Sequence, residues 1–299
     1  MKRILFFYLG ILLGLFVLLQ WLNAGGDYAI ERELWQINKK YERLALDPYA
    51  VPENEFQQAV RDYESLIKRY PRSPVTPNVY LQISEVHALR KNYALARDVL
   101  QYAIGEYKDN LEFCAQAMTG VAKTYELENQ WEKAKGIYQQ IIDKYPLTMV
   151  GINTPIYIAN HYEVRNDSRG SQEAYQKAIR FYKKTAAEHT NSSIEFNCLR
   201  LLANCYFALG QWEEGLEALG EVLLKYPVPN YLTEQRVELI TKTINLVAVQ
   251  RLKEPQQAVR IYKEFIEQYP GHLWNSFFQR MVVELSDYNE KVSEASQEK

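Results

Sequence analysis

The sequence has few of the residues that cross-link small folds. Its 299 residues include 3 cysteines and 13 glycines. Three thiols are too few, and odd in number, for a disulfide framework. Cys198 and Cys205 lie seven positions apart on one predicted helix, roughly 10 Å along its axis, which exceeds the reach of a disulfide bond. We expect Cys114, Cys198 and Cys205 to be small buried apolar residues, and a bridge from Cys114 to one of the others stays open for an oxidising compartment.

Charge excess and catalytic motifs are also missing. The chain has 35 Lys and Arg against 37 Asp and Glu, so no basic surplus favours a nucleic acid partner. It contains no phosphate-binding loop, dinucleotide fingerprint, nucleophile elbow or zinc-protease motif. The four histidines, His87, His161, His189 and His272, share no spacing. We therefore predict no catalytic residue, no metal site and no cofactor, and a protein that is not an enzyme.

A single long apolar run is present, over residues 4–22. Nineteen helical residues span roughly 28 Å, close to the ~30 Å hydrocarbon core of a bilayer. Lys2 and Arg3 precede the run and acidic residues follow it, so the positive-inside rule places the N-terminus in the cytoplasm. We predict that residues 1–26 are a signal anchor, which makes a single-pass membrane protein with its C-terminal domain on the periplasmic or other extracytoplasmic side.

The alternative is a signal peptide removed near Gly26, which would leave a secreted periplasmic protein. The small residues of 24–26 suit signal peptidase, although the apolar run is long for a cleavable signal. Because no cysteine lies near this segment, a lipid-attached N-terminus is excluded.

A pattern recurs six times along the rest of the chain. A small residue is followed four positions later by tyrosine or leucine, and Tyr-Pro ends four of the six copies. The small residues are Ala59, Ala96, Ala134, Ala178, Gly215 and Ala258, and the later residues are Tyr63, Leu100, Tyr138, Tyr182, Leu219 and Tyr262. The copies are spaced by 37, 38, 44, 37 and 43 residues, which indicates a solenoid of repeated units.

Each copy is predicted to be the second helix of a pair, since its small and apolar residues share one face and proline ends it. The first helix carries an apolar residue, a small residue and a tyrosine, as in Leu202, Ala203 and Tyr206. Ser84 and His87 replace the small and aromatic residues in the second pair. An insertion around 166–173 predicts a longer loop between two helices.

These shared positions resemble the tetratricopeptide repeat (TPR) over about 55–285. The long period is similar to that of periplasmic TPR proteins such as the outer-membrane assembly lipoprotein BamD, and to translocon-associated TPR proteins with one anchor. The resemblance implies an all-α, right-handed superhelical solenoid of about six helix pairs, preceded by the N-terminal transmembrane helix.

The predicted solenoid covers 27–285. Its repeats lie near 28–71, 75–109, 112–146, 153–190, 193–227 and 231–270, and a helix over 272–285 caps the last one. Residues 28–48 supply the first helix of the first repeat, although a coiled-coil partner helix is an alternative. We expect 286–299 to be a disordered tail.

The TPR resemblance also implies a partner-binding groove on the first helices. In arrays that bind peptides, the groove side chains flank the small and aromatic positions. Here those are Glu85, Lys123, Glu126, Asn160, Glu163, Arg200, Asn204 and Phe207. Lys123, Asn160, Arg200 and Asn204 offer donors to peptide carbonyls or to a C-terminal carboxylate. The alternative for each is a solvated helix face, and the full cationic clamp of chaperone-binding members is absent.

The sequence therefore predicts a non-enzymatic, membrane-anchored scaffold or adaptor that binds protein or peptide partners in an extracytoplasmic envelope complex. We expect no nucleic acid and no small-molecule substrate. The alternative function is a periplasmic assembly or chaperone factor that holds secreted or outer-membrane clients.

Overall fold

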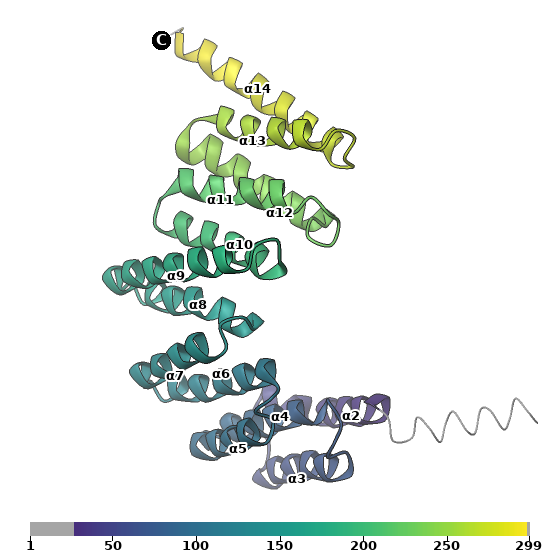
Figure 1. Cartoon of the computed structure of the whole chain (residues 1–299). Helices are drawn as coiled ribbons and strands as arrows, with labels where there is room; N and C mark the ends of the chain where they lie inside the picture. The colour runs from purple at the N-terminus through teal and green to yellow at the C-terminus, as the bar shows by residue number, and fades with distance from the viewer. Residues whose placement is uncertain (1–26, 298–299) are drawn as a thin grey trace, which may run out of the picture. The chain divides into compact units, whose positions relative to one another are not determined.

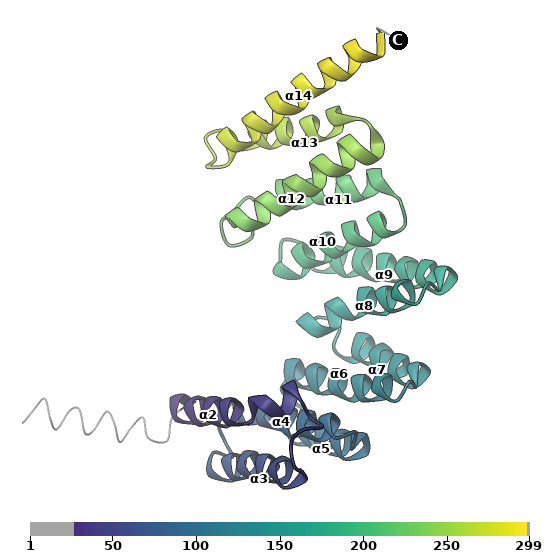
Figure 2. The same ribbon diagram turned by 180° about the vertical axis from the view of Figure 1, so that it is seen from behind.

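The computed structural model describes the backbone of residues 27–297 and the side chains of 28–288, and this part of the chain consists of helices joined by turns and short loops (Figures 1 and 2). It contains thirteen α-helices, α2 to α14, with one short π-helix and no strand. The all-α prediction is thus confirmed for these residues. The predicted transmembrane segment at 4–22 lies outside them, and none of the described helices is both long and apolar enough to cross a membrane.

Two compact units make up the chain, 1–150 and 151–299. In the first unit, consecutive helices pack as hairpins, with α4 against α5, α5 against α6, and α6 against α7. Its helices are α2 (Asp27–Leu46), α3 (Glu53–Arg69), α4 (Thr76–Leu89), α5 (Tyr93–Glu106), α6 (Leu111–Leu127) and α7 (Trp131–Lys144).

The second unit continues the pattern. Helix α10 packs between α9 and α11, and α13 packs against α14 (Figures 1 and 2). Its helices are α8 (Met149–Val164), which begins two residues before the boundary, α9 (Ser168–Glu188), α10 (Ser193–Ala208), α11 (Trp212–Lys225), α12 (Glu234–Leu246), η1 (Val247–Leu252), α13 (Pro255–Gln268) and α14 (Asn275–Gln297).

A residue with a positive φ angle, in the left-handed backbone region, ends the turn inside each repeat from the second to the sixth. These residues are Lys91 (φ 60°), Asn129 (57°), Asn166 (57°), Gly210 (72°) and Lys253 (62°). A positive φ reverses the chain after a helix and lets the next amides bond back to the last turn. Short hairpin turns follow, so the two helices of a repeat are antiparallel neighbours.

Side-chain caps begin three helices. Asn110 accepts a hydrogen bond from the Phe113 amide, Asp167 from the Gly170 amide, and Ser192 from the Glu195 amide. Each satisfies an amide that has no partner inside its helix. The caps fix where α6, α9 and α10 start.

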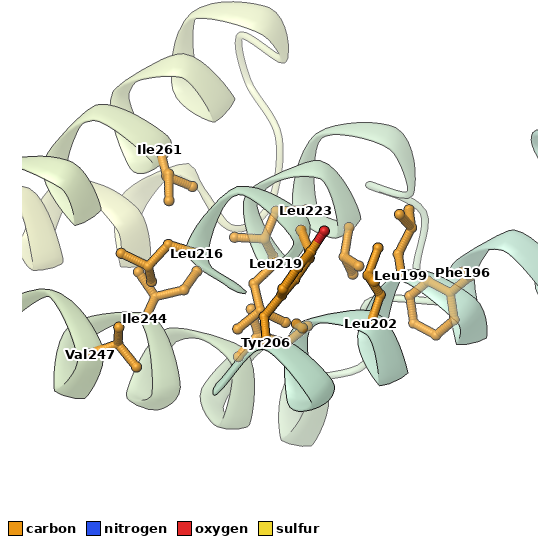
Figure 3. Packing of buried hydrophobic residues seen from close by; sticks show 14 of the residues in the cluster. Phe196, Leu199, Leu202, Tyr206, Leu216, Leu219, Leu223, Ile244, Val247 and Ile261 are labelled. Atoms are coloured by element: carbon orange, nitrogen blue, oxygen red, sulfur yellow. The ribbon is translucent and has the colours of Figure 1, made fainter. Parts of the chain in front are cut away.

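The apolar cores of the two units differ in continuity. In the first unit, one cluster runs from Ile30 to Val86 and a separate one from Leu100 to Val121. In the second, one cluster runs from Ile152 to Leu285. Figure 3 shows its centre, where side chains of α10 and α11 meet Ile244, Val247 and Ile261. The small repeat residues, including Ala59, Ala96, Ala134, Ala178 and Ala258, are fully buried in these hairpins.

Three features differ from the sequence prediction. Residues 166–173 do not form a long loop: Asp167 caps α9 and the extra residues lengthen that helix at its start. Helix α14 continues to Gln297, so most of the expected tail at 286–299 is helical. The first helix of the sixth repeat ends in a π-helix, Val247–Leu252, that the apolar spacing did not predict.

Candidate partner-binding surface

All eight residues of the predicted groove lie on the first helix of a repeat, in α4, α6, α8 or α10. Glu85, Lys123 and Glu126 belong to the first unit, and the other five to the second. The candidate surface is therefore described separately in each unit.

In the first unit, Glu85 and Lys123 are exposed and Glu126 is half-buried. Glu85 lies close enough to the buried Tyr63 of α3 to act on its phenol. Burial first, and then the negative charge of Glu85, raise the pKa of Tyr63 to about 12. Tyr63 stays protonated and donates to Asn38 Oδ1 at 2.8 Å, which ties α3 to α2.

Asn160 and Glu163 of α8 take part in holding their own hairpin together. The hydroxyl of Tyr175 on α9 lies 2.7 Å from Asn160 Oδ1 and also hydrogen-bonds to Glu163. Burial and the bond to Glu163 raise the pKa of Tyr175 above its ordinary value. Since the amide nitrogen of Asn160 is not used by Tyr175, this exposed residue keeps donors for a partner.

Arg200 of α10 is the most unusual residue of the predicted set. It is half-buried, and its guanidinium carbon lies 5.5 Å from the centre of the Phe196 ring. Arg236, in the first turns of α12, lies at the same distance from that ring. Burial and then the positive charge of Arg236 lower the pKa of Arg200. Two cations are thus held at one aromatic ring.

No described carboxylate forms an ion pair with either arginine. The nearby buried Glu195 is engaged elsewhere, by Lys225 Nζ at 2.9 Å, the Tyr226 hydroxyl and the Asn191 amide. Burial by itself raises the pKa of Glu195, but these bonds outweigh it and the pKa is lowered. Glu195 is therefore an ionised anchor for the start of α10 and not a partner of the two arginines. Arg236 Nη1 donates instead to the backbone oxygens of Asn230 at 3.2 Å and Tyr231 at 3.0 Å.

Asn204 and Phe207 differ in what they offer. Asn204 is exposed one turn after Arg200. Phe207 stacks on Trp212 with 6.0 Å between ring centres, and a Cβ added at Gly215 would lie 2.2 Å from Phe207 Cε1. Because its ring fills the space above Gly215, Phe207 mainly packs the α10–α11 hairpin.

Arg236 was absent from the predicted set. The predicted groove positions were defined within a single repeat, whereas Arg200 and Arg236 come from the first helices of two successive repeats. A positive residue in the first turn of a helix, where the helix dipole disfavours it, was the available signal.

The described residues offer no metal centre or reactive thiol. No group of three or more His, Cys, Asp or Glu in them could hold a metal ion. All three cysteines are free and buried, in line with the prediction that they are small apolar residues. Burial raises the pKa of both Cys198 and Cys205 to about 12, which keeps these thiols protonated.

Comparison with protein families supports the repeat assignment. Models described as tetratricopeptide repeat match residues 49–111, 116–148 and 247–272. The model described as anaphase-promoting complex, cyclosome, subunit 3 matches 170–222. No curated protein matches this chain.

Solved structures show distant likenesses. The Cut9–Hcn1 hetero-tetramer of the APC/C is 14% identical, with TM-score 0.34 and 88% of this chain covered; the chain spans 47% of that one, about half its length. The TPR2AB domain of yeast Sti1 in complex with pHSP90 is 11% identical, with TM-score 0.34. The match covers 87% of this chain and 100% of that one. A tetratricopeptide repeat protein from Parabacteroides merdae is 11% identical, with TM-score 0.30. The match covers 85% of this chain and 99% of that one. At this level of similarity, the binding partners of these proteins are not assigned to this chain.

Proposed function

We propose that this chain, whose repeats the family models support as tetratricopeptide repeats, is a non-enzymatic, membrane-anchored adaptor that binds a protein partner in an extracytoplasmic complex. TPR proteins generally mediate protein–protein interactions and are typically scaffolds. The finer likeness to periplasmic BamD-type and single-anchor TPR proteins is part of the proposal. The partner is an extended peptide segment or helix of another protein.

One observation carries the partner-binding proposal: Arg200 and Arg236 both lie at the Phe196 ring, and neither forms an ion pair with a described carboxylate. A partly buried guanidinium group binds most strongly to an acidic group, because a carboxylate accepts two of its N–H hydrogen bonds in one plane. Asn204, one turn further along α10, adds an amide that can bond to a peptide backbone. The surface therefore favours an acidic peptide segment.

Photocrosslinking in native membranes tests this adaptor function. A photoactivatable residue placed at Asn204 should join the chain to one partner in stable, stoichiometric amounts. The same residue at Arg180, exposed on the second helix α9, is the matched control and should give no such product. Short-lived crosslinks to many newly exported clients would instead support the chaperone alternative.

The contribution of the arginine site is tested with the double variant Arg200→Ala, Asn204→Ala. Loss of a charge-assisted contact should weaken partner capture by about tenfold or more. Helical content should stay unchanged, and Arg180→Ala should bind as the original chain does. Unchanged capture by the folded double variant would show that this face of α10 is not the binding surface.

The anchor proposal is supported by the apolar run at 4–22 and its flanking charges. An anchored chain should stay in the membrane pellet after carbonate extraction and keep its N-terminus, as read by mass spectrometry. A mature protein that begins close to residue 27 would instead identify a removed signal peptide. Digestion of the repeats by protease added to spheroplasts with an intact inner membrane would place them outside the cytoplasm, and their survival would place them inside it.

A further inference from the structure

A hollow of about 490 Å³ opens in the first unit over α4, between α3 and α5. Ile67, Ile83 and Val99 form its apolar walls, and Tyr80, Tyr102 and His87 also line it. The rings of Tyr80 and Tyr102 have centres 5.9 Å apart, so one wall is aromatic. A hollow of this size falls in the range of sites that hold small ligands or single side chains.

His87 stands where three other repeats have tyrosine. The backbone defines this equivalence, because one carbonyl near the end of each first helix accepts the amide five residues later in the turn. The carbonyls of Tyr125, Tyr162 and Tyr206 accept at 2.8, 3.0 and 2.9 Å, and that of His87 accepts at 3.0 Å. The second repeat therefore has an imidazole at the position of a phenol.

In two of these three repeats, a cation of the neighbouring helix lies over the tyrosine ring. Arg97 lies 4.4 Å from the centre of the Tyr125 ring, and Lys183 lies 5.5 Å from that of Tyr206. The repeat framework thus accommodates an aromatic ring with a cation over its face at this position. The smaller side chain of His87 supplies neither the large ring nor such a pair.

The charges beside the hollow complement a cation. Glu64 of α3 and Asp98 of α5 line it, both are exposed, and neither forms an ion pair with a described residue. Lys68 is the one basic side chain among the lining residues. Burial lowers the pKa of His87 in spite of Glu64, so its imidazole is neutral at neutral pH and compatible with an apolar guest.

We propose that this hollow binds one aromatic side chain of a partner peptide, with an adjacent cationic residue of that peptide placed beside Glu64 and Asp98. The guest ring packs on the apolar walls and the two tyrosines, in the space that a repeat tyrosine would enter. The site lies in the first unit and does not depend on the acidic-peptide surface of α10 in the second.

Binding is tested on the full chain with three short peptides, acetyl-Lys-Phe-Lys-amide, acetyl-Lys-Ala-Lys-amide and acetyl-Glu-Phe-Glu-amide. The histidine rings carry a carbon-13 label, and four signals report on His87, His161, His189 and His272. The Lys-Phe-Lys peptide should move the His87 signal saturably and bind about tenfold more tightly than either other peptide. The remaining three signals should not move.

His87→Tyr is the decisive variant, since it fills the hollow with the chain's own ring. It should weaken Lys-Phe-Lys binding by about tenfold or more, measured by fluorescence anisotropy of a labelled peptide, and raise the Tm. His189→Tyr, at a half-buried histidine of the second unit, is the matched control and should leave binding unchanged. If His87→Tyr fails to fold, Tyr102→Ala removes an exposed wall residue and should weaken binding in the same direction.

Three results would overturn the proposal. The Ala peptide binding as tightly as the Phe peptide would leave only charge attraction. Unchanged binding by folded His87→Tyr or Tyr102→Ala would place the peptide elsewhere. Concentration-dependent self-association that His87→Tyr abolishes would identify a second copy of this chain as the occupant.

Discussion

The two units are built from the same repeat, yet their cores are organised differently. Apolar contacts are continuous from Ile152 to Leu285 in the second unit, whereas the first has two clusters. The division falls inside the second repeat, where α4 belongs mainly to one cluster and α5 to the other. Ser84 and His87 of α4 replace the alanine and tyrosine of other repeats. These two departures from the repeat pattern therefore lie where the buried core divides.

Continuity of the core should determine how each unit opens. In repeat arrays each repeat is stabilised by its immediate neighbours, so a weak joint divides the array into parts that unfold separately. We expect α2–α4 to exchange amide hydrogens independently of α6 and α7. The repeats of the second unit should instead open together.

The largest effect is expected from Phe265→Ala. Phe265 is fully buried and packs on Tyr269, His272 and Phe278. The cavity should cost about 3–5 kcal/mol of unfolding free energy and speed hydrogen exchange across α8–α14. Leu66→Ala, at a fully buried residue of the first unit, is the matched counterpart and should speed exchange only in α2–α4. Hydrogen exchange measured by mass spectrometry distinguishes the two patterns. Faster exchange throughout α2–α7 in Leu66→Ala would refute the contrast between the cores.

A smaller effect is expected from Gly215→Ala. Five repeats have alanine at this position, but in the fifth the Phe207 ring occupies the space of the missing methyl group. The alanine should cost about 1–3 kcal/mol because the ring must move off Trp212. Thermal unfolding of Gly215→Ala, Phe207→Ala and the double variant gives the coupling between the two sites. If the two single effects simply add, Phe207 does not fill that space.

The smallest effect concerns Glu195 and pH. Its folded pKa lies below the ordinary value of 4.5. Its contribution to stability is therefore complete above that ordinary value and is lost as the pH falls through the lower folded pKa. Glu195→Gln should cost about 1 kcal/mol at neutral pH, since it keeps the shape but loses the charge opposite Lys225. Urea unfolding between neutral and acid pH should show less acid destabilisation in the variant than in the original chain.

Periodic features of the fold could be predicted from sequence. The small residues, the aromatic positions and the Tyr-Pro endings located the helix pairs, because each reports packing inside one hairpin. The boundaries of two helices escaped prediction. The residues of 166–173 extended α9 because Asp167 could cap it, and helix α14 continued beyond 285.

The candidate surface was only partly predictable because it depends on contacts between different helices. Arg200 and Asn204 were found by their place in the repeat. Arg236 was not, since its meeting with Arg200 at Phe196 needs two repeats to be stacked. Phe207 was assigned to a groove, but Gly215 provides a recess that draws its ring inward.

The π-helix at Val247–Leu252 has a consequence for how such chains change length. A wider turn accommodates an additional residue without breaking the helix that contains it. The copies that flank this segment, at Gly215 and Ala258, are 43 residues apart, among the longest intervals in the chain. We expect a codon gained or lost there to alter one turn of backbone and to leave the hairpins on both sides intact, which makes this segment a place where the gene can change in length.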